Sequence, residues 1–122
     1  LIVKGKGTPA CGAAGVDTLL SRKVNFTALV ASNDDMAIGA MKQLHEHGVS
    51  VPAQVSVIGF DDIALAPYTI PALSSVKIPV TEMIQETIGR LIFMLGDGAF
   101  RPPKTFTGEL IQRDSVAPPA SR

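Results

Sequence analysis

Several features that would assign this sequence to a class at once are scarce or missing. Its 122 residues include no tryptophan, one tyrosine and one cysteine, and only 18% of them are charged. A single cysteine, Cys11, excludes an internal disulfide framework and agrees with a reducing cytoplasm. No apolar run approaches the roughly 18–20 residues that a membrane span needs. What remains is a chain with 46% hydrophobic residues, enough to build the core of one compact domain.

The balance of charge excludes another class of protein. Eleven basic residues are offset by eleven acidic ones, so the chain has no net charge at neutral pH. Proteins that grip nucleic acid rely on an excess of lysine and arginine to contact the phosphates. We therefore expect that this chain does not bind DNA by itself. It also begins with Leu1 rather than methionine, and we expect it to be part of a longer protein.

Short apolar runs alternate with stretches of helical spacing. We expect strands at residues 1–3, 26–31 and 55–60, an extended segment at 73–80, and a return strand within 104–113. Helices are expected after the start signals Thr8-Pro9, Ser32 and Thr81, and Gly48 is expected to end the second helix. This alternation predicts an α/β fold, a Rossmann-like parallel sheet with helices on both faces and with 26–31 as a central strand.

Two of the predicted helices carry distinct apolar faces. In the second helix, four residues form a stripe that is expected to face the core: Ala37, Ala40, Met41 and Leu44. In the last helix, five large aliphatic residues share one face: Ile84, Ile88, Leu91, Ile92 and Leu95. Pro79 excludes the segment 73–80 from a central strand position and directs the last helix away from the first three strands. We expect that a lobe outside this chain covers that face. The alternatives are that the helix packs back on the visible sheet or that a second chain covers it.

Polar residues gather where the parallel strands end. Ligands of such sheets bind beyond the carboxyl ends of the strands, where the sequence places residues 5–8, 32–34 and 60–62. Asp61 is interpreted as a carboxylate that accepts ligand hydroxyls, or as a turn residue only. Asn33 either binds a ligand through its amide or caps a helix, and both roles are compatible if Ser32 is the cap. Asp34 and Asp62 are expected to stabilise a helix N-terminus and a turn.

An enzyme is the alternative that these carboxylates leave open. Asp34 and Asp61 could serve a Mg²⁺-dependent phosphoryl transfer, because acidic residues on adjacent loops suit that ion. However, no nucleophile or imidazole base is evident near the predicted rim, and His45 and His47 do not share a helix face. We therefore expect no catalytic residue, no metal and no cofactor.

Three motifs occur in order along the chain and point to one family. They are LVASNDDMAIGAM at 29–41, VIGFDD at 57–62, and Tyr68-x-x-Pro-x-Leu-x-x-Val at 68–76. This arrangement resembles the LacI/GalR family of bacterial repressors. The resemblance implies a cytoplasmic, homodimeric, non-enzymatic regulator that binds a sugar effector between two lobes. It also implies that operator DNA is bound only through an N-terminal helix-turn-helix that this chain lacks, and that no membrane is involved.

The resemblance also implies roles for particular residues. Asn33 and Asp61 fall on positions that contact the effector in relatives. The family often has an aromatic residue on the first rim loop, where this chain has Gly7, so a stacking platform for the ligand is expected to be missing. The positions that meet the other subunit are three: Ile38, Lys42 and Tyr68.

The same resemblance divides the chain into segments. Residues 1–76 would form the C-terminal lobe of the effector-binding core, and residues 77–105 would cross to the other lobe and provide a helix there. Residues 106–122 would return as a strand and a tail. A periplasmic sugar-binding protein of the same fold is the second alternative, which a signal peptide upstream of Leu1 would favour.

Overall fold

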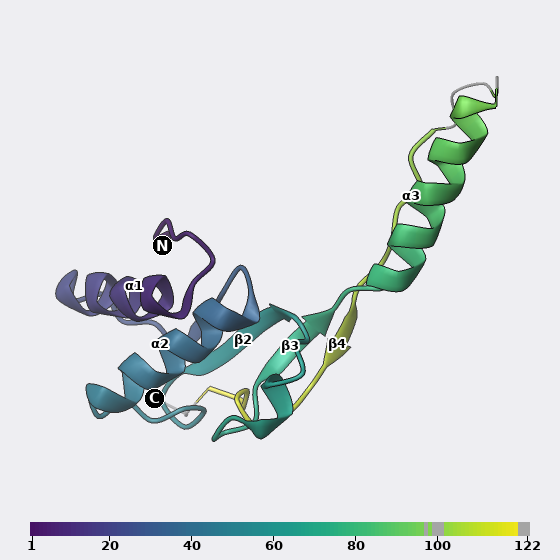
Figure 1. Cartoon of the computed structure of the whole chain (residues 1–122). Coiled ribbons are helices and arrows are strands. Elements are labelled where there is room, and N and C mark those ends of the chain that lie inside the picture. The colour runs from purple at the N-terminus through teal and green to yellow at the C-terminus, as the bar shows by residue number, and fades with distance from the viewer. Residues whose placement is uncertain (97, 99–101, 120–122) are drawn as a thin grey trace.

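The chain forms an open sheet with two helices packed beside it and a third helix set apart (Figure 1). The computed structural model describes residues 1–96, 98 and 102–119. The elements are α1 (Pro9–Ser21), β1 (Ala28–Val30), α2 (Asp34–Glu46), β2 (Ser56–Asp61), the 3-10 turn η1 (Ala66–Tyr68), β3 (Ser74–Lys77), α3 (Val80–Leu95) and β4 (Glu109–Ile111). Residues 97 and 99–101 of the predicted segment 77–105, and residues 120–122 of the predicted segment 106–122, lie outside the described residues.

The sheet confirms the predicted α/β class and corrects its details. Its strand order is β1-β2-β3-β4, with parallel pairing among the first three strands and antiparallel pairing between β3 and β4. β1 is therefore an edge strand of the sheet rather than a central one. β3 lies inside the sheet, against our expectation, because the strand ends at Lys77 and Pro79 lies beyond its last pair.

The core lies between α2 and the sheet. All four residues of the predicted stripe are buried, as expected: Ala37, Ala40, Met41 and Leu44. They pack with Val16 of α1, Val57 of β2 and Leu73 before β3. The helical period of the sequence thus identified the face of α2 that is removed from water.

Helices α1 and α2 cross in backbone contact. A Cβ atom added at Gly12 would lie 2.0 Å from the carbonyl oxygen of Met36, and one at Gly39 would lie 1.9 Å from that of Pro9. Only glycine fits at both positions. His47 Nε2, just beyond the C-terminal end of α2, lies 2.7 Å from Oδ1 of Asp17 within α1. The helix N-termini are consequently held side by side.

Two of the predicted helix boundaries are confirmed, and two others differ from the prediction by one or two residues. Thr8 caps α1 with Pro9 as its first residue, and Gly48 has a φ of +71° just beyond α2. The cap of α2 is Asn33 rather than Ser32, because the helix begins one residue later than expected. α3 begins at Val80 and not after Thr81, since the carbonyl of Pro79 already accepts a hydrogen bond from the Met83 amide.

The predicted strand at residues 1–3 is wrong. The segment belongs to no strand of the sheet, and a cleft of about 360 Å³ is lined by this segment and by β1. Ile2 and Val3 line one side of this cleft, and Leu29 and Val30 line the other. A strand needs a hydrogen-bonded neighbour about 4.8 Å away, which this segment does not have.

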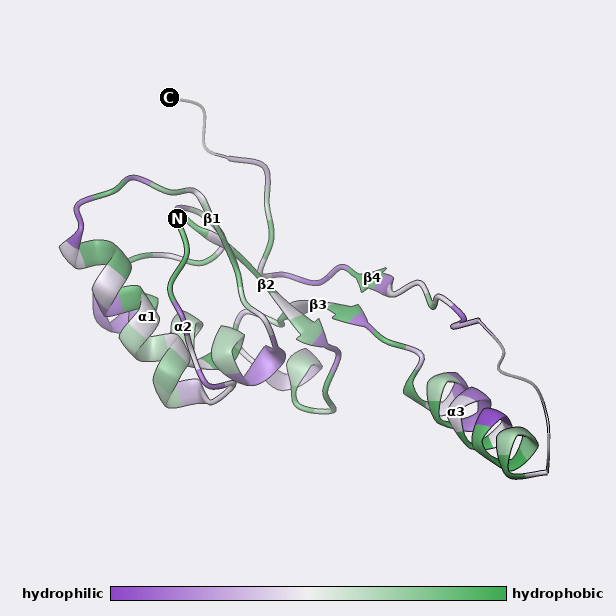
Figure 2. Ribbon diagram, turned by 90° about the horizontal axis from the view of Figure 1, so that it is seen from above, coloured by the Kyte–Doolittle hydropathy of each residue, from purple (hydrophilic) through white to green (hydrophobic). Residues whose placement is uncertain are grey.

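Helix α3 stands clear of the sheet and of the other two helices in both views (Figure 1 and Figure 2). The chain reaches it from β3 and returns through β4. The five aliphatic residues of its predicted apolar face are all exposed, and the least exposed of them, Ile88, is at 52%. The sheet therefore does not cover this face, as we expected. Its assignment to a second lobe stays a prediction.

Within the residues described here, no helix has both the length and the apolar character to cross a membrane.

Candidate functional site

Two of the three expected rim loops are joined by the side chain of Asn33. Its Nδ2 donates to the carbonyl oxygen of Gly7 at 2.9 Å, and its Oδ1 accepts from the amide of Met36 at 3.0 Å. Asn33 is thus the helix cap itself, and it also fixes the loop before α1. A carboxamide has two N–H donors, so one remains that a ligand hydroxyl could accept.

The first rim loop is shaped for glycine. Gly7 has a φ of +75°, which residues with a side chain rarely adopt. A Cβ atom there would lie 3.4 Å from Nδ2 of Asn33, so backbone strain rather than space restricts the position. That the effector site lacks a stacking platform at Gly7 stays a prediction.

Asp61 is the last residue of β2 and presents an exposed carboxylate beside the N-terminus of α2. Desolvation raises its pKa, and the nearby charges of Asp34 and Asp35 raise it further. No hydrogen bond to its carboxylate comes from the part of the chain that the structure describes. The oxygens of Asp61 are therefore available to accept hydroxyl groups of a ligand.

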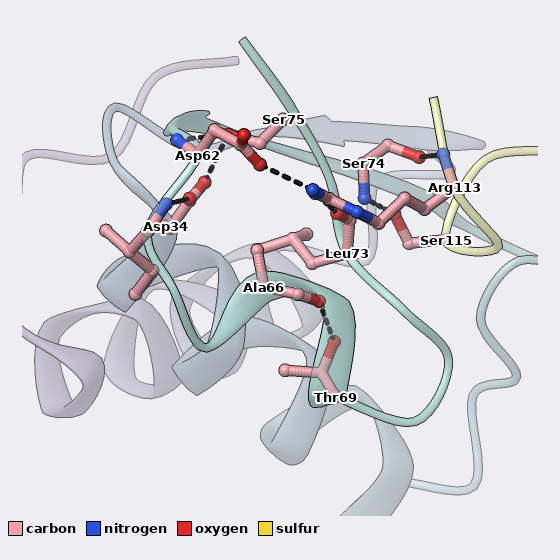
Figure 3. Close-up of polar contacts among 10 residues, drawn as sticks. Asp34, Asp62, Ala66, Thr69, Leu73, Ser74, Ser75, Arg113 and Ser115 are labelled. Atoms are coloured by element: carbon pink, nitrogen blue, oxygen red, sulfur yellow. Dashed lines mark hydrogen bonds and ion pairs between the residues drawn. The ribbon is translucent and has the colours of Figure 1, made fainter. Parts of the chain in front are cut away.

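Asp34, in contrast, is wholly committed to the protein interior (Figure 3). Its Oδ1 accepts from Ser75 Oγ at 2.6 Å, and its Oδ2 accepts from the Ile63 amide at 2.8 Å. A Cβ atom at Gly59 would lie 2.0 Å from Oδ1, so a glycine in β2 makes room for this carboxylate. Asp34 is thus structural, but its hydrogen-bond partners belong to β3 and to the turn after β2 rather than to the N-terminus of α2, which the sequence predicted.

This burial concerns the pairing of Asp34 with Asp61 on which the enzyme alternative depends. Asp34 has no exposed surface and both of its oxygens are occupied. Among the described residues, no group of three His, Cys, Asp or Glu side chains is arranged to hold a metal.

A second polar cluster lies beside Asp34 and was not anticipated. Arg113 donates through Nη2 to Asp62 Oδ1 and through Nη1 to the carbonyl oxygen of Leu73, both at 2.7 Å. Its amide donates to Ser74 Oγ, and Ser115 Oγ accepts from the Ser74 amide (Figure 3). No local sequence signal announces a partner 51 residues away. The glycine inside VIGF could have indicated a close approach at β2.

The three residues predicted to meet a second subunit differ in exposure. Ile38 is half-buried against the core, whereas Lys42, on the same face of α2, is exposed and forms an ion pair with Glu46. Tyr68, in η1, is 79% exposed, and Ile70 just after it is 97% exposed. The contact of these residues with a second subunit stays a prediction.

Comparisons with known proteins agree with these features. Residues 2–116 match the family model of the periplasmic binding protein-like domain. The chain is 75% identical over 120 residues to the HTH-type transcriptional regulator AscG of Escherichia coli K12, covering 98% of this chain and 36% of AscG. It therefore spans little more than a third of that relative.

Solved structures show the same arrangement. A sugar-binding transcriptional regulator of the LacI family from Escherichia coli, complexed with phosphate, matches 97% of this chain and 43% of its own, with a TM-score of 0.87 and 76% identity. The lac repressor dimer bound to operator and the anti-inducer ONPF matches 92% of this chain and 39% of its own, with a TM-score of 0.86 and 28% identity.

Proposed function

This chain belongs to the periplasmic binding protein-like domains of LacI-family transcriptional regulators, and on that premise we propose that it is the effector-binding and dimerisation part of a sugar-responsive repressor. Its residues 28–93 resemble the repressor of the β-glucoside (asc, arbutin–salicin–cellobiose) operon, so β-glucosides are the proposed effector class. The repressor acts in the cytoplasm and binds operator DNA through a helix-turn-helix that lies outside this chain.

One observation carries the proposal. Asp61 holds a carboxylate at the carboxyl end of β2 with no hydrogen-bonding partner among the described residues, although its neighbours disfavour its charge. A charged group retained under such conditions is typical of a binding site. Sugars present rows of hydroxyl donors, for which a fixed carboxylate is a good acceptor. Asn33, with one free N–H, completes a polar rim.

The position of α3 supports the two-lobed arrangement. The helix starts three residues after Lys77, the residue paired with Asp61, so the rim faces the space into which α3 extends. We propose that the exposed face of α3 packs in the second lobe and that the effector binds between the lobes. Closure of the lobes on the effector would then change the spacing of the DNA-binding heads.

The remaining proposals concern the partner and the rival functions. Ile38, Lys42 and Tyr68 are proposed to meet the second subunit, because the resemblance to the family places these positions there and Tyr68 is exposed. A periplasmic sugar-binding protein is disfavoured, since the similar proteins described above are transcriptional regulators. A non-enzymatic role agrees with the commitment of Asp34 to the interior.

The test is Asp61→Asn in the full-length regulator, titrated with salicin by calorimetry. Asparagine keeps the shape and tolerates a positive φ, but it replaces one acceptor oxygen with a donor. We expect affinity to fall at least tenfold, since a hydrogen bond to a charged group is worth about 1.5–3 kcal/mol, while the dimer persists in light scattering.

The matched control is Asp114→Asn, an exposed aspartate that follows β4 and lies outside the rim loops. It should leave salicin affinity unchanged. Equal affinity of wild type and Asp61→Asn would contradict the proposed site.

A further inference from the structure

The backbone at the end of β2 is strained where it presents the proposed effector contact. Asp61 and Asp62 are consecutive residues with φ values of +109° and +54°, and neither is glycine. Residues with side chains seldom occupy this region, because it strains their backbone, and they remain there when surrounding contacts hold them. The direction in which Asp61 points therefore depends on whatever fixes this turn.

Three side chains from separate elements fix it (Figure 3). Ser75 Oγ of β3 accepts from the Asp62 amide at 3.0 Å, and Asp34 Oδ2 of α2 accepts from the Ile63 amide at 2.8 Å. Arg113 donates to the carboxylate of Asp62 at 2.7 Å. The first two contacts hold the backbone after Asp61. The third holds the side chain of the second strained residue.

Arg113 is itself rigidly placed. Besides Asp62 it binds the carbonyl oxygen of Leu73, and its own amide is held by Ser74 Oγ. The side chains of Arg113 and Asp62 are only 18% and 13% exposed. An ion pair so shielded from water is sensitive to the removal of either partner, unlike a pair on the open surface.

Arg113 also differs from the other two contacts in its place along the chain. It follows β4, on the segment that returns from α3, whereas Asp34 and Ser75 precede α3. The turn that carries Asp61 is thus tied to the returning segment by one side chain.

We propose that Arg113 is a positioning residue for effector binding, whose ion pair with Asp62 holds the strained turn so that the Asp61 carboxylate faces the ligand. This inference rests on the proposed function, because it assumes that Asp61 contacts the effector. Arg113 touches no ligand itself. Its other hydrogen bonds go from Nη1 to the carbonyl oxygen of Leu73 and from its own amide to Ser74 Oγ. Its contact with the strained turn is therefore the ion pair with Asp62.

The experiment uses Arg113→Met and Arg113→Lys in the full-length regulator. Methionine keeps the apolar stem and removes the charge, and we expect it to weaken salicin binding at least tenfold in calorimetry. Lysine restores the charge near Asp62, although it cannot hold Asp62 and Leu73 at once in the planar fork of arginine. It should therefore recover part of the affinity.

The matched control is Ser115→Ala, which removes hydrogen bonds to the Ser74 amide and the Val57 carbonyl in the same buried cluster without touching the turn. It should lower the melting temperature but leave salicin affinity within twofold of wild type. A similar loss of affinity in Ser115→Ala would reduce Arg113 to a general contribution to folding and would overturn the inference.

A crystal structure of Arg113→Met gives a readout that needs no ligand. We expect the backbone of Asp61 and Asp62 to leave the left-handed region, and an unchanged turn would overturn the inference. The two proposals fail differently. If Asp61→Asn binds salicin like wild type, the proposed site is wrong. If Asp61→Asn loses binding while Arg113→Met retains it, only the role of Arg113 is wrong.

Discussion

At the scale of single residues, the charge that Asp61 would offer to the effector lowers the stability of the fold. Its pKa is raised by desolvation and by the charges of Asp34 and Asp35. The folded protein therefore favours the protonated carboxyl of Asp61. This preference stabilises the folded state fully at pH values below 3.8, the ordinary pKa of aspartate. This stabilisation is lost as the pH rises through the raised pKa. At neutral pH the ionised Asp61 consequently destabilises the folded state.

Asp61→Asn should for this reason stabilise the protein at neutral pH. The gain should shrink as the pH falls through the raised pKa and vanish below 3.8, where wild-type Asp61 is also uncharged. Melting temperatures of the two proteins across this range measure the difference. A variant that is less stable than wild type at neutral pH would show that Asp61 is ionised with a structural partner.

Sequence alone indicated which polar residues lie near the strand ends, but not which of them caps the helix and which is buried. Asn33 and Asp61 follow the parallel strands β1 and β2, whose following loops lie at one edge of the sheet, whereas the segment before Gly7 is not a strand. That these three residues bind a ligand stays a prediction. That Asn33 is the helix cap and Asp34 the buried partner of Ser75 depends on where α2 begins, which a single residue of offset decides. Arg113 could not be found, because its partner is distant in sequence.

At the scale of secondary structure, the crossing of α1 over α2 determines how the rim loops are spaced. Gly39→Ala would place a methyl group within 1.9 Å of the Pro9 carbonyl oxygen, so the helices must separate. Overpacking of this kind costs roughly 1–3 kcal/mol. We expect a lower urea midpoint and weaker effector binding, since Asn33 would no longer reach Gly7.

Gly89→Ala is the matched control for that variant. Gly89 lies inside α3, and a methyl group added there would meet no atom of another element within 4 Å. Alanine should therefore stabilise the helix by about 0.5–1 kcal/mol. Equal responses of the two variants to urea would show that the crossing tolerates a side chain.

Helices were predicted better than strands. Periodicity and caps are local signals, and they gave α1 and the buried face of α2. Strands depend on partners: residues 1–3 are apolar but unpaired, and β3 is interior although a proline follows it. The antiparallel direction of β4 follows from the path of the chain through α3, which residue spacing does not encode.

At the scale of the whole molecule, α3 leaves an apolar face that a complete regulator is expected to bury. Ile88→Gln should therefore destabilise the full-length protein by about 1.5–3 kcal/mol, the value of burying one large aliphatic side chain. Chemical denaturation of the full-length protein measures the loss. Glu82→Gln, on the opposite side of the helix, should change stability little. Equal, small effects would mean that α3 remains in solvent.

The class of the fold and the family were within reach of the sequence, because alternating elements and three ordered motifs extend over most of the chain. The partner of α3 was not. Its apolar stripe is exposed in this chain, and the burial of that stripe in a second lobe stays a prediction.

The excursion through α3 has a consequence for chain length. It leaves the sheet at Lys77 and rejoins it at Glu109, and these two residues are directly paired. In polymer terms the excursion is a closed loop, and the entropy of closing a loop grows only with the logarithm of its length. Each doubling would cost about 0.6 kcal/mol. We therefore expect the sheet to tolerate insertions in the excursion, and we expect the proposed packing of α3 in the second lobe to be what limits its length.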